Sequence, residues 1–227
     1  MINERSEQLY FGYDRPEMVQ FLPDEYSKVL EIGCNVGNFR RFVNKPCEYW
    51  GVEPFEAAAN IAKTKMDKIL VDFYDKIEDE IPDNYFDLVI ANDVIEHMEQ
   101  PWNFLKSVKK KMTEKASLIL AIPNVRYYEN LKKMLFHKDW KYEDCGILDI
   151  THLRFFTKKS IIRLLNETEF EIEMMKGISP VKVRRRHLPK YWIAKIILGA
   201  DIEFLQFGVK VRKLNFQQGK LPIESLL

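Results

Sequence analysis

Short apolar runs alternate with longer amphipathic stretches over the first half of the chain. Apolar runs bounded by turn residues are typical of buried strands, whereas apolar residues every three or four positions are typical of helices. The pattern predicts strands at residues 28–32, 49–53, 68–71, 86–91 and 117–122, with helices at 38–44, 55–66 and 102–112. Because right-handed crossovers join such strands into one sheet, we expect a doubly wound α/β fold.

The second half of the chain has a different pattern. Residues 123–150 are rich in aromatic and charged residues and contain no clean strand. Thr157 is a candidate N-cap for a helix at 158–167. Two further strands are predicted at 170–175 and 206–212, with a basic segment and a helix between them. No linker or repeat divides the chain, so we expect a single domain over residues 1–227.

The composition indicates the cellular compartment and excludes some classes of binding partner. The net charge of +1 selects neither nucleic acid nor membrane as a partner. Cys34, Cys47 and Cys145 form no CxxC pair and no metal-ligand spacing, which indicates a reducing compartment. The N-terminus has no apolar signal core, and no apolar run reaches the length of a membrane span. We expect a cytoplasmic protein.

The stretch VLEIGCNVGNF predicts a nucleotide-binding turn at the end of the first strand. Such a turn presents backbone N–H groups and a helix N-terminus to a ligand. The dinucleotide fingerprint would need glycine at Asn35 and Asn38, so the turn disfavours NAD. The spacing that fits is acid-x-Gly-x-x-x-Gly, formed by Glu31, Gly33 and Gly37. Asn35 is compatible with this turn because asparagine visits left-handed backbone conformations readily.

Two more acids end the next two predicted strands. Glu53 can accept hydrogen bonds from both hydroxyls of a ribose. Asp72 can accept from an adenine amine, with Phe73 beside the ring. Because the carboxyl ends of parallel strands meet at one edge of a sheet, the three acids predict a nucleoside site there.

The stretches VLEIGCNVGNF, GVEP, VDFYD and FDLVIANDVIEHMEQP, in this order, resemble class I S-adenosylmethionine-dependent methyltransferases from about residue 10 to residue 212. The resemblance implies a seven-stranded Rossmann-like sheet whose last two strands form an antiparallel hairpin, and S-adenosylmethionine as cofactor. Residues 1–27 would cover the cofactor, with Arg15 on its carboxylate. The candidate cofactor-binding residues are Tyr10, Arg15, Glu31, Gly33, Cys34, Asn35, Gly37, Glu53, Pro54, Asp72, Phe73 and Asn92.

Methyl transfer depends on holding acceptor, methyl carbon and sulfur in line. An oxygen acceptor must also lose a proton, so a base with a near-neutral pKa is expected. His97 follows the fourth strand, and His152 precedes the helix at 158–167. We favour His152 as the base, with His97 and Asp149 as further catalytic candidates, whereas His137 and His187 lie among basic residues and are read as surface.

A metal is the alternative for the segment after the fourth strand. If that segment is helical, Asp93, Glu96 and His97 share one face and are weak candidates for metal ligands. Some ring-hydroxyl methyltransferases of similar pattern are magnesium-assisted. We expect no metal, because such residues commonly brace a loop without one.

Residues 123–157 form the expected acceptor-side insert. They resemble a subgroup of these methyltransferases associated with O-antigen or capsule polysaccharide biosynthesis. The acceptor would be a nucleotide sugar, sugar phosphate or saccharide, methylated on a hydroxyl or a phosphoryl group. Aromatic faces stack on sugar rings, and Phe155 and Phe156 are read as core anchors. The candidate substrate-binding residues are Asn124, Arg126, Tyr128, Trp140 and Arg154.

Two rival functions remain open at this point: a metal-assisted methyltransferase of quinone or phenol rings, and a non-catalytic cofactor-binding partner subunit. Residues 181–199 carry six basic residues and no acid. Packing of this segment on the sheet is favoured over a peripheral membrane patch. Nucleic acid is not expected as a partner, because no recognisable binding module is present. A monomer or a homodimer is expected.

Overall fold

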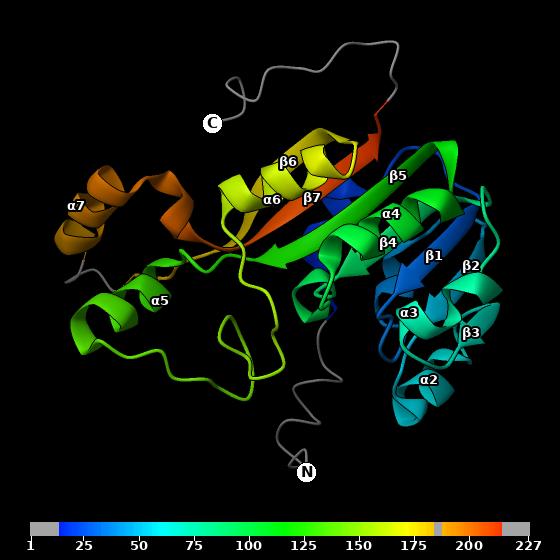
Figure 1. The fold of residues 1–227 in the computed structure, drawn as a ribbon, viewed down its shortest axis with the longest axis horizontal. Helices are drawn as coiled ribbons and strands as arrows, with labels where there is room; N and C mark the ends of the chain where they lie inside the picture. The colour runs from blue at the N-terminus through cyan, green and yellow to red at the C-terminus, as the bar shows by residue number, and fades with distance from the viewer. Residues whose placement is uncertain (1–13, 184–187, 215–227) are drawn as a thin grey trace.

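The computed structural model describes residues 14–183 and 188–214, so Tyr10 and His187 lie outside the described residues. A central sheet with helices on both faces dominates the molecule (Figure 1). Its seven strands are β1 (Lys28–Ile32), β2 (Glu48–Val52), β3 (Lys68–Leu70), β4 (Phe86–Asn92), β5 (Met112–Pro123), β6 (Phe170–Pro180) and β7 (Phe204–Lys213).

The strand order is β3-β2-β1-β4-β5-β7-β6. Strands β1 to β5 are parallel, whereas β7 runs antiparallel to both β5 and β6. The predicted seven-stranded α/β sheet with a terminal hairpin is therefore confirmed. The order reverses between β1 and β4, which opens a crevice at the carboxyl ends of these two strands.

The helices are short, and several are single 3-10 turns. The predicted helix at 38–44 is only a four-residue turn, because Pro46 disfavours helical conformation just before it. The helical segments are η1 (Pro16–Phe21), η2 (Phe39–Phe42), α2 (Glu56–Ala62), α3 (Tyr74–Ile77), η3 (Glu78–Glu80), η4 (Ile95–His97), α4 (Pro101–Lys111), α5 (Tyr128–Lys132), η5 (Lys133–His137), α6 (Lys158–Glu167), α7 (Leu188–Leu198) and η7 (Ala200–Glu203). Within the described residues, no helix is long and apolar enough to cross a membrane.

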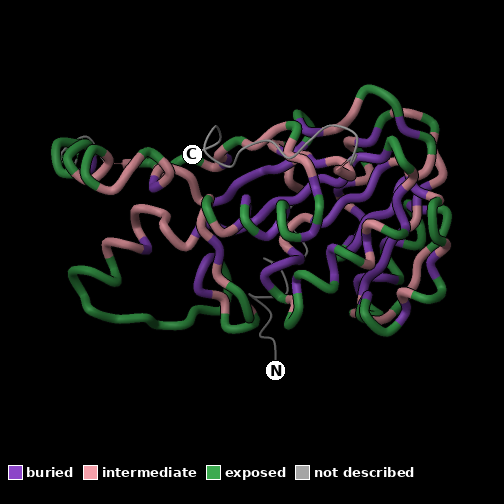
Figure 2. The backbone as a smooth tube through the Cα atoms, turned by 45° about the horizontal axis from the view of Figure 1, so that its top comes forward, coloured by how far each residue is buried: buried purple, intermediate pink, exposed green. Residues whose placement is uncertain are grey.

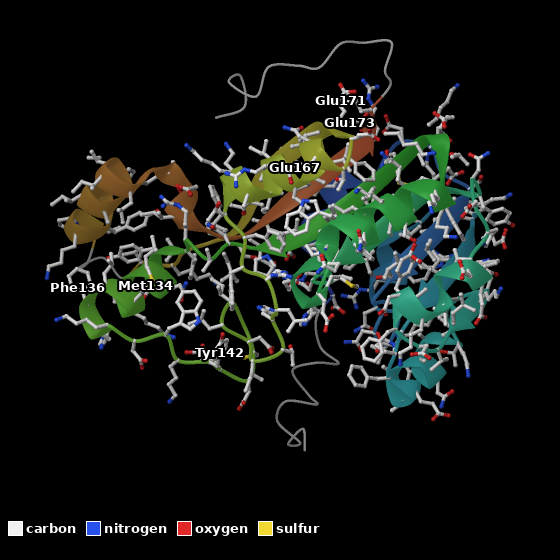
Figure 3. All side chains as sticks on the ribbon, in the orientation of Figure 1. Met134, Phe136, Tyr142, Glu167, Glu171 and Glu173 are labelled. Carbon is white, nitrogen blue, oxygen red and sulfur yellow. The ribbon has the colours of Figure 1, made fainter. Side chains whose placement is uncertain are left out.

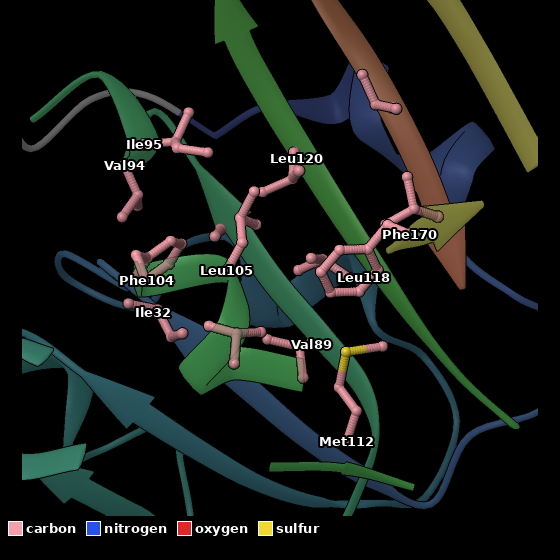
Figure 4. Packing of buried hydrophobic residues seen from close by; sticks show 14 of the residues in the cluster. Ile32, Val89, Val94, Ile95, Phe104, Leu105, Met112, Leu118, Leu120 and Phe170 are labelled. Carbon is pink, nitrogen blue, oxygen red and sulfur yellow. The ribbon is translucent and has the colours of Figure 1, made fainter. Parts of the chain in front are cut away.

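Alternation along the strands divides the core into two layers. Val89 and Leu118 point to one face, where they share a cluster with apolar residues of α4 and α6. Figure 4 shows Phe104 and Leu105 of α4 in this cluster. The adjacent strand residues Leu88 and Ile119 point to the other face, against η1, η2 and α2. The tube in Figure 2 shows the buried strands between partly exposed helices. Both faces of the sheet are covered, as parallel strands require.

The turn η1 is fixed by a close approach to β7. Met18 and Phe21 are fully buried. Gly208 of β7 lies under the Phe21 ring, and a Cβ at this position would come within 2.4 Å of it. Only glycine fits here, and the contact holds the start of η1, with Arg15 at its N-cap, over the sheet.

Helix α7 does not pack on the sheet, so the prediction that residues 181–199 pack there is wrong. Together with α5 it lies at one end of the molecule, beyond the sheet (Figures 1 and 2). Trp192, Ile193, Ile196 and Ile197 are exposed. The reason is that α6 and η1 already cover the two faces of the sheet near β6 and β7.

Replacing Gly208 with alanine should destabilise the protein by about 1–3 kcal/mol, because the new methyl group must displace the Phe21 ring. Urea unfolding measures the loss. Phe21→Leu removes the clashing ring atoms, so Gly208→Ala should cost little in a Phe21→Leu background. An equal cost in both backgrounds would contradict the packing of η1 on β7.

Candidate active site

The turn after β1 has the geometry of a ligand-binding loop. Gly33, Asn35 and Gly37 all have positive φ angles, of 69°, 49° and 71°. The N–H groups of Gly33 and Cys34 donate to the Val52 carbonyl, at 2.8 and 3.1 Å. A Cβ on Gly33 would lie 2.7 Å from a Val94 methyl carbon. The first glycine is thus required by both conformation and space, and Asn35 adopts the left-handed conformation expected of it.

Glu53 lies at the end of β2, as predicted, but it faces inward. Its carboxylate accepts the Asn35 N–H at 2.8 Å and the Phe55 N–H at 3.0 Å. The residue is almost fully buried. In this conformation Glu53 shapes the glycine turn, and the hydroxyls of a ribose would approach a carboxylate that already holds two backbone donors.

Glu31 and Cys34 differ from their predicted positions at the ligand. The Glu31 carboxylate is buried and accepts the Tyr49 hydroxyl at 2.8 Å. Burial raises the pKa of Glu31 to about 8, although the Tyr49 hydrogen bond opposes this and the Glu53 charge adds to it. The Cys34 side chain packs in the core with Phe39 and Met66. Both side chains support the glycine turn from the core of the protein and do not face the ligand side.

The adenine side of the predicted site is open. Asp72 is partly exposed; its carboxylate accepts the N–H of Phe73 at 2.7 Å and lies 3.4 Å from the Lys76 ammonium. The Phe73 ring is 53% exposed. Pro54 is half-buried beside this edge. An exposed aromatic ring next to a strand-end carboxylate is suited to stacking on a base and accepting from its amine.

Asn92, the last residue of β4, carries the clearest sign of an absent ligand. Both polar atoms of its amide are buried, and neither has a hydrogen-bond partner among the described residues. A buried amide without partners is costly, and such groups in native proteins call for an explanation. Together with the glycine turn, it fits a polar cofactor at the carboxyl ends of β1 and β4.

Arg15 does reach this edge, but its partner is a protein carboxylate. Its guanidinium donates to Asp93 at 2.5 Å and to Gln206 at 2.7 Å. Gln206 in turn donates to Asp93. Asp93 pulls the pKa of Arg15 upward against the effect of its burial. Sequence reasoning missed Gln206, although it is a polar residue at the start of the predicted apolar strand at 206–212.

The second polar cluster consists of Glu96, His97 and His152. One potential ligand atom from each lies within 4.8 Å of the other two. The prediction that Asp93, Glu96 and His97 share a helix face is wrong. Residues 95–97 form a single 3-10 turn, and Asp93 precedes it with a φ of 56°, which turns it toward Arg15. His152 takes its place in the cluster.

Backbone carbonyls orient both imidazoles. His152 Nδ1 lies 2.9 Å from the Ile147 oxygen, and His97 Nδ1 lies 3.2 Å from the Thr151 oxygen. A carbonyl only accepts, so each Nδ1 must carry the proton when the ring is neutral. This leaves both Nε2 lone pairs available. His152 Nε2 lies 3.9 Å from the Glu96 carboxylate.

Burial determines the charge of this cluster. It raises the pKa of Glu96 well above the ordinary value, and the Asp93 charge adds to the effect. Neither carboxyl oxygen of Glu96 has a hydrogen-bond partner among the described side chains and backbone. Burial lowers the pKa of His97, and the neighbouring His152 lowers it further. In its neutral form, an imidazole whose Nε2 lies beside a buried carboxyl group can accept a proton or bind a cation.

The insert brings aromatic rings next to His152. The rings of Trp140 and Phe155 meet edge to face at 5.1 Å, and Tyr142 lies 6.5 Å from Phe155 (Figure 3 shows Tyr142 on the insert). The His152 ring is 6.5 Å from the same Phe155. Phe156 is a core anchor, as predicted. The same prediction for Phe155 is wrong, because its half-buried ring lies at the centre of this aromatic group.

Asp149 holds the loop that carries His152. Its carboxylate accepts the N–H and the hydroxyl of Thr151, at 2.8 and 2.6 Å. The Thr151 carbonyl then contacts His97. Asp149 therefore acts on the two imidazoles through Thr151.

Four predicted acceptor-binding residues hold protein segments together instead. Asn124 is fully buried and donates to the carbonyls of Asp201 and Phe204, at 2.8 and 2.9 Å. Arg126 binds the Asp201 carboxylate at 2.6 Å. Tyr128 packs on Tyr191 of α7. Arg154 donates to the Glu99 carbonyl at 3.1 Å. These contacts stabilise the insert, because each one joins it to another segment.

Comparisons with known proteins agree with this geometry. The family model described as a methyltransferase domain matches residues 9–174. An S-adenosylmethionine-dependent methyltransferase from Archaeoglobus fulgidus is 17% identical, with 91% of this chain and 97% of that chain covered and a TM-score of 0.62. A "possible histamine N-methyltransferase" from Thermotoga maritima is 18% identical, with 92% and 95% covered and a TM-score of 0.63. The search of curated proteins gives no match.

The chain belongs to the methyltransferase-domain family. It is an enzyme, a methyltransferase whose cofactor is S-adenosylmethionine. The glycine turn, Asp72 with Phe73, and the unpartnered amide of Asn92 would hold this cofactor, which supplies an electrophilic methyl group when bound.

Glu31 should make stability fall as pH rises. Its pKa is about 8 in the native state and lower when unfolded, so between about pH 4.5 and 8 the native state holds one proton more. The free energy of unfolding should drop by up to about 1.4 kcal/mol per pH unit in this window. In Glu31→Gln the drop should be absent, as measured by urea unfolding at several pH values. Identical pH profiles for the two proteins would refute this.

Asn92→Leu should separate folding from cofactor binding. Removing an unpartnered buried amide costs no hydrogen bond, so the melting temperature should not fall. Affinity for S-adenosylhomocysteine, measured by calorimetry, should drop by about tenfold or more, since each 1.4 kcal/mol is tenfold. Asn103→Leu, on an exposed part of α4, is the control and should bind normally. Full affinity in Asn92→Leu would place the cofactor elsewhere.

Proposed function

We propose that this methyltransferase O-methylates a hydroxyl of a sugar or glycan acceptor, with His152 as the general base. The observation that carries the proposal is the orientation of the two imidazoles. Because the Ile147 carbonyl can only accept a hydrogen bond, the neutral form of His152 carries its proton on Nδ1 and presents the Nε2 lone pair that a base needs. A phosphoryl oxygen is already ionised and would need no base, so the presence of His97 and His152 favours a hydroxyl acceptor.

The aromatic group of the insert supports a sugar as acceptor. Trp140 and Tyr142 are partly exposed beside Phe155, on the same segment as His152. Exposed aromatic faces are suited to stacking on the apolar face of a sugar ring. The resemblance of the insert to enzymes of surface-polysaccharide biosynthesis points the same way. The three cysteines are free, which agrees with a reaction in the cytoplasm.

A metal-assisted reaction on a phenol or quinone ring is the second candidate. It is favoured by the cluster of Glu96, His97 and His152 and by the unpartnered oxygens of Glu96. Neutral imidazoles whose Nδ1 donates to a carbonyl are the usual form of histidine ligands. A divalent cation would ionise Glu96 and would lower the pKa of a hydroxyl bound to it.

The test is transfer of labelled methyl from S-adenosylmethionine to nucleotide sugars, saccharides, sugar phosphates and phenols, with and without a chelator. We expect label in a sugar hydroxyl with chelator present. His152→Ala should lower the rate by about 10²–10⁴ while binding of S-adenosylhomocysteine is kept. The control is His137→Ala, an exposed histidine of the same insert.

The outcomes separate the two candidates. Label in a phenol that is lost with chelator, and lost in Glu96→Gln, would support the metal-assisted reaction and refute the sugar acceptor. Label in a sugar that His152→Ala does not reduce would refute the role of His152 as the general base. The proposal of a sugar acceptor would then remain.

A further inference from the structure

The outer ends of α7 and η5 present large apolar side chains to solvent. We call this group the end patch: Leu135 and Phe136 of η5 with Trp192, Ile193, Ile196 and Ile197 of α7. Ile196 is 81% and Phe136 80% exposed. Figure 3 places Phe136 at the same end of the molecule as α7. An apolar group of this size on one surface marks an interaction site.

Contacts on the inner side of α7 hold the end patch in place. On the inner side of α7, the buried Tyr191 ring packs edge to face on Tyr128 of α5, with 5.1 Å between ring centres. Arg126 binds the Asp201 carboxylate and also donates to the Leu198 carbonyl at the end of α7. The outer side of α7 is therefore exposed although the helix itself is held in place.

The charge around α7 selects the kind of partner. Lys182 and Lys190 are exposed, whereas Lys195 of α7 is paired with Glu203. By sequence alone, residues 181–199 also include three arginines and no acid. Two copies meeting through this surface would bring like charges together, which disfavours a symmetric dimer. An anionic surface complements it. Basic residues flanking tryptophan and isoleucine are the composition of helices that lie in a lipid headgroup region.

The length of α7 excludes a membrane span. Its 11 residues extend about 16 Å, roughly half of the ~30 Å hydrocarbon core. Trp192 and the isoleucines would reach the boundary between headgroups and acyl chains while the basic residues stay with the phosphates.

We propose that the end patch docks this protein on the surface of an anionic lipid bilayer. The proposal goes beyond the methyl-transfer reaction, because docking requires neither cofactor nor acceptor. Binding is both apolar and electrostatic, so it needs anionic headgroups and weakens as salt screens the charges.

The experiment is co-sedimentation of the full chain with vesicles of equal parts phosphatidylglycerol and phosphatidylcholine, and with phosphatidylcholine alone. We expect binding to the anionic vesicles, reduced by salt, and little binding to the neutral ones. Ile196→Glu/Ile197→Glu should weaken binding by at least about tenfold, since two inserted side chains are lost and two negative charges are added. Both side chains are mostly exposed, so the melting temperature should not change.

Ile61→Glu is the matched control, because Ile61 is an exposed isoleucine on α2, outside the end patch. It should bind vesicles as the unaltered protein does. Failure of the unaltered protein to bind anionic vesicles would overturn the proposal, as would equal binding by the α7 variant. Light scattering that shows a dimer dissociated by the α7 substitutions would also overturn it, because the end patch would then bind a second copy.

Discussion

The carboxylate of Glu53 ties two turns together at the carboxyl edge of the sheet. It accepts one backbone N–H from Asn35, in the left-handed turn after β1, and one from Phe55, at the start of α2. A buried carboxylate without such donors would be strongly unfavourable. The direction of the Asn35 N–H, and with it the left-handed conformation in the middle of the glycine turn, thus depends on one side chain at the end of β2.

This constraint also explains the second buried acid. Glu31 lies close enough to Glu53 for the charge of one to raise the pKa of the other. Two ionised carboxylates in one buried place would repel each other. With a pKa of about 8, Glu31 is mostly protonated at neutral pH and keeps its contact with Tyr49. The stability of the turn is linked to pH through a residue that does not face the ligand.

The sheet and the cofactor half of the site could be predicted from the sequence because both depend on local patterns. Leu88 and Val89 alternate between two cores, and the strand-end acids necessarily meet at one edge. Local pattern did not predict that Asp93 turns away from Glu96, because that depends on one positive φ angle. Nor did it predict the meeting of His97 with His152, because the Thr151 carbonyl that positions the His97 ring belongs to a loop far along the chain.

The acceptor half shows why polar residues beyond a strand end are ambiguous. Asn124 and Arg126 follow β5, where a family resemblance suggests contact with substrate, yet both bind segments next to β7. Hydrogen-bond partners decide between the two roles, because the Asn124 amide has satisfied donors and no capacity left for a ligand, whereas the Asn92 amide has no partner among the described residues. Two further contacts hold α7 in place: Arg126 donates to the Leu198 carbonyl, and Tyr128 of α5 packs on Tyr191. Residues that sequence reasoning assigned to acceptor binding therefore fix the orientation of α7 and of the apolar surface it presents to solvent.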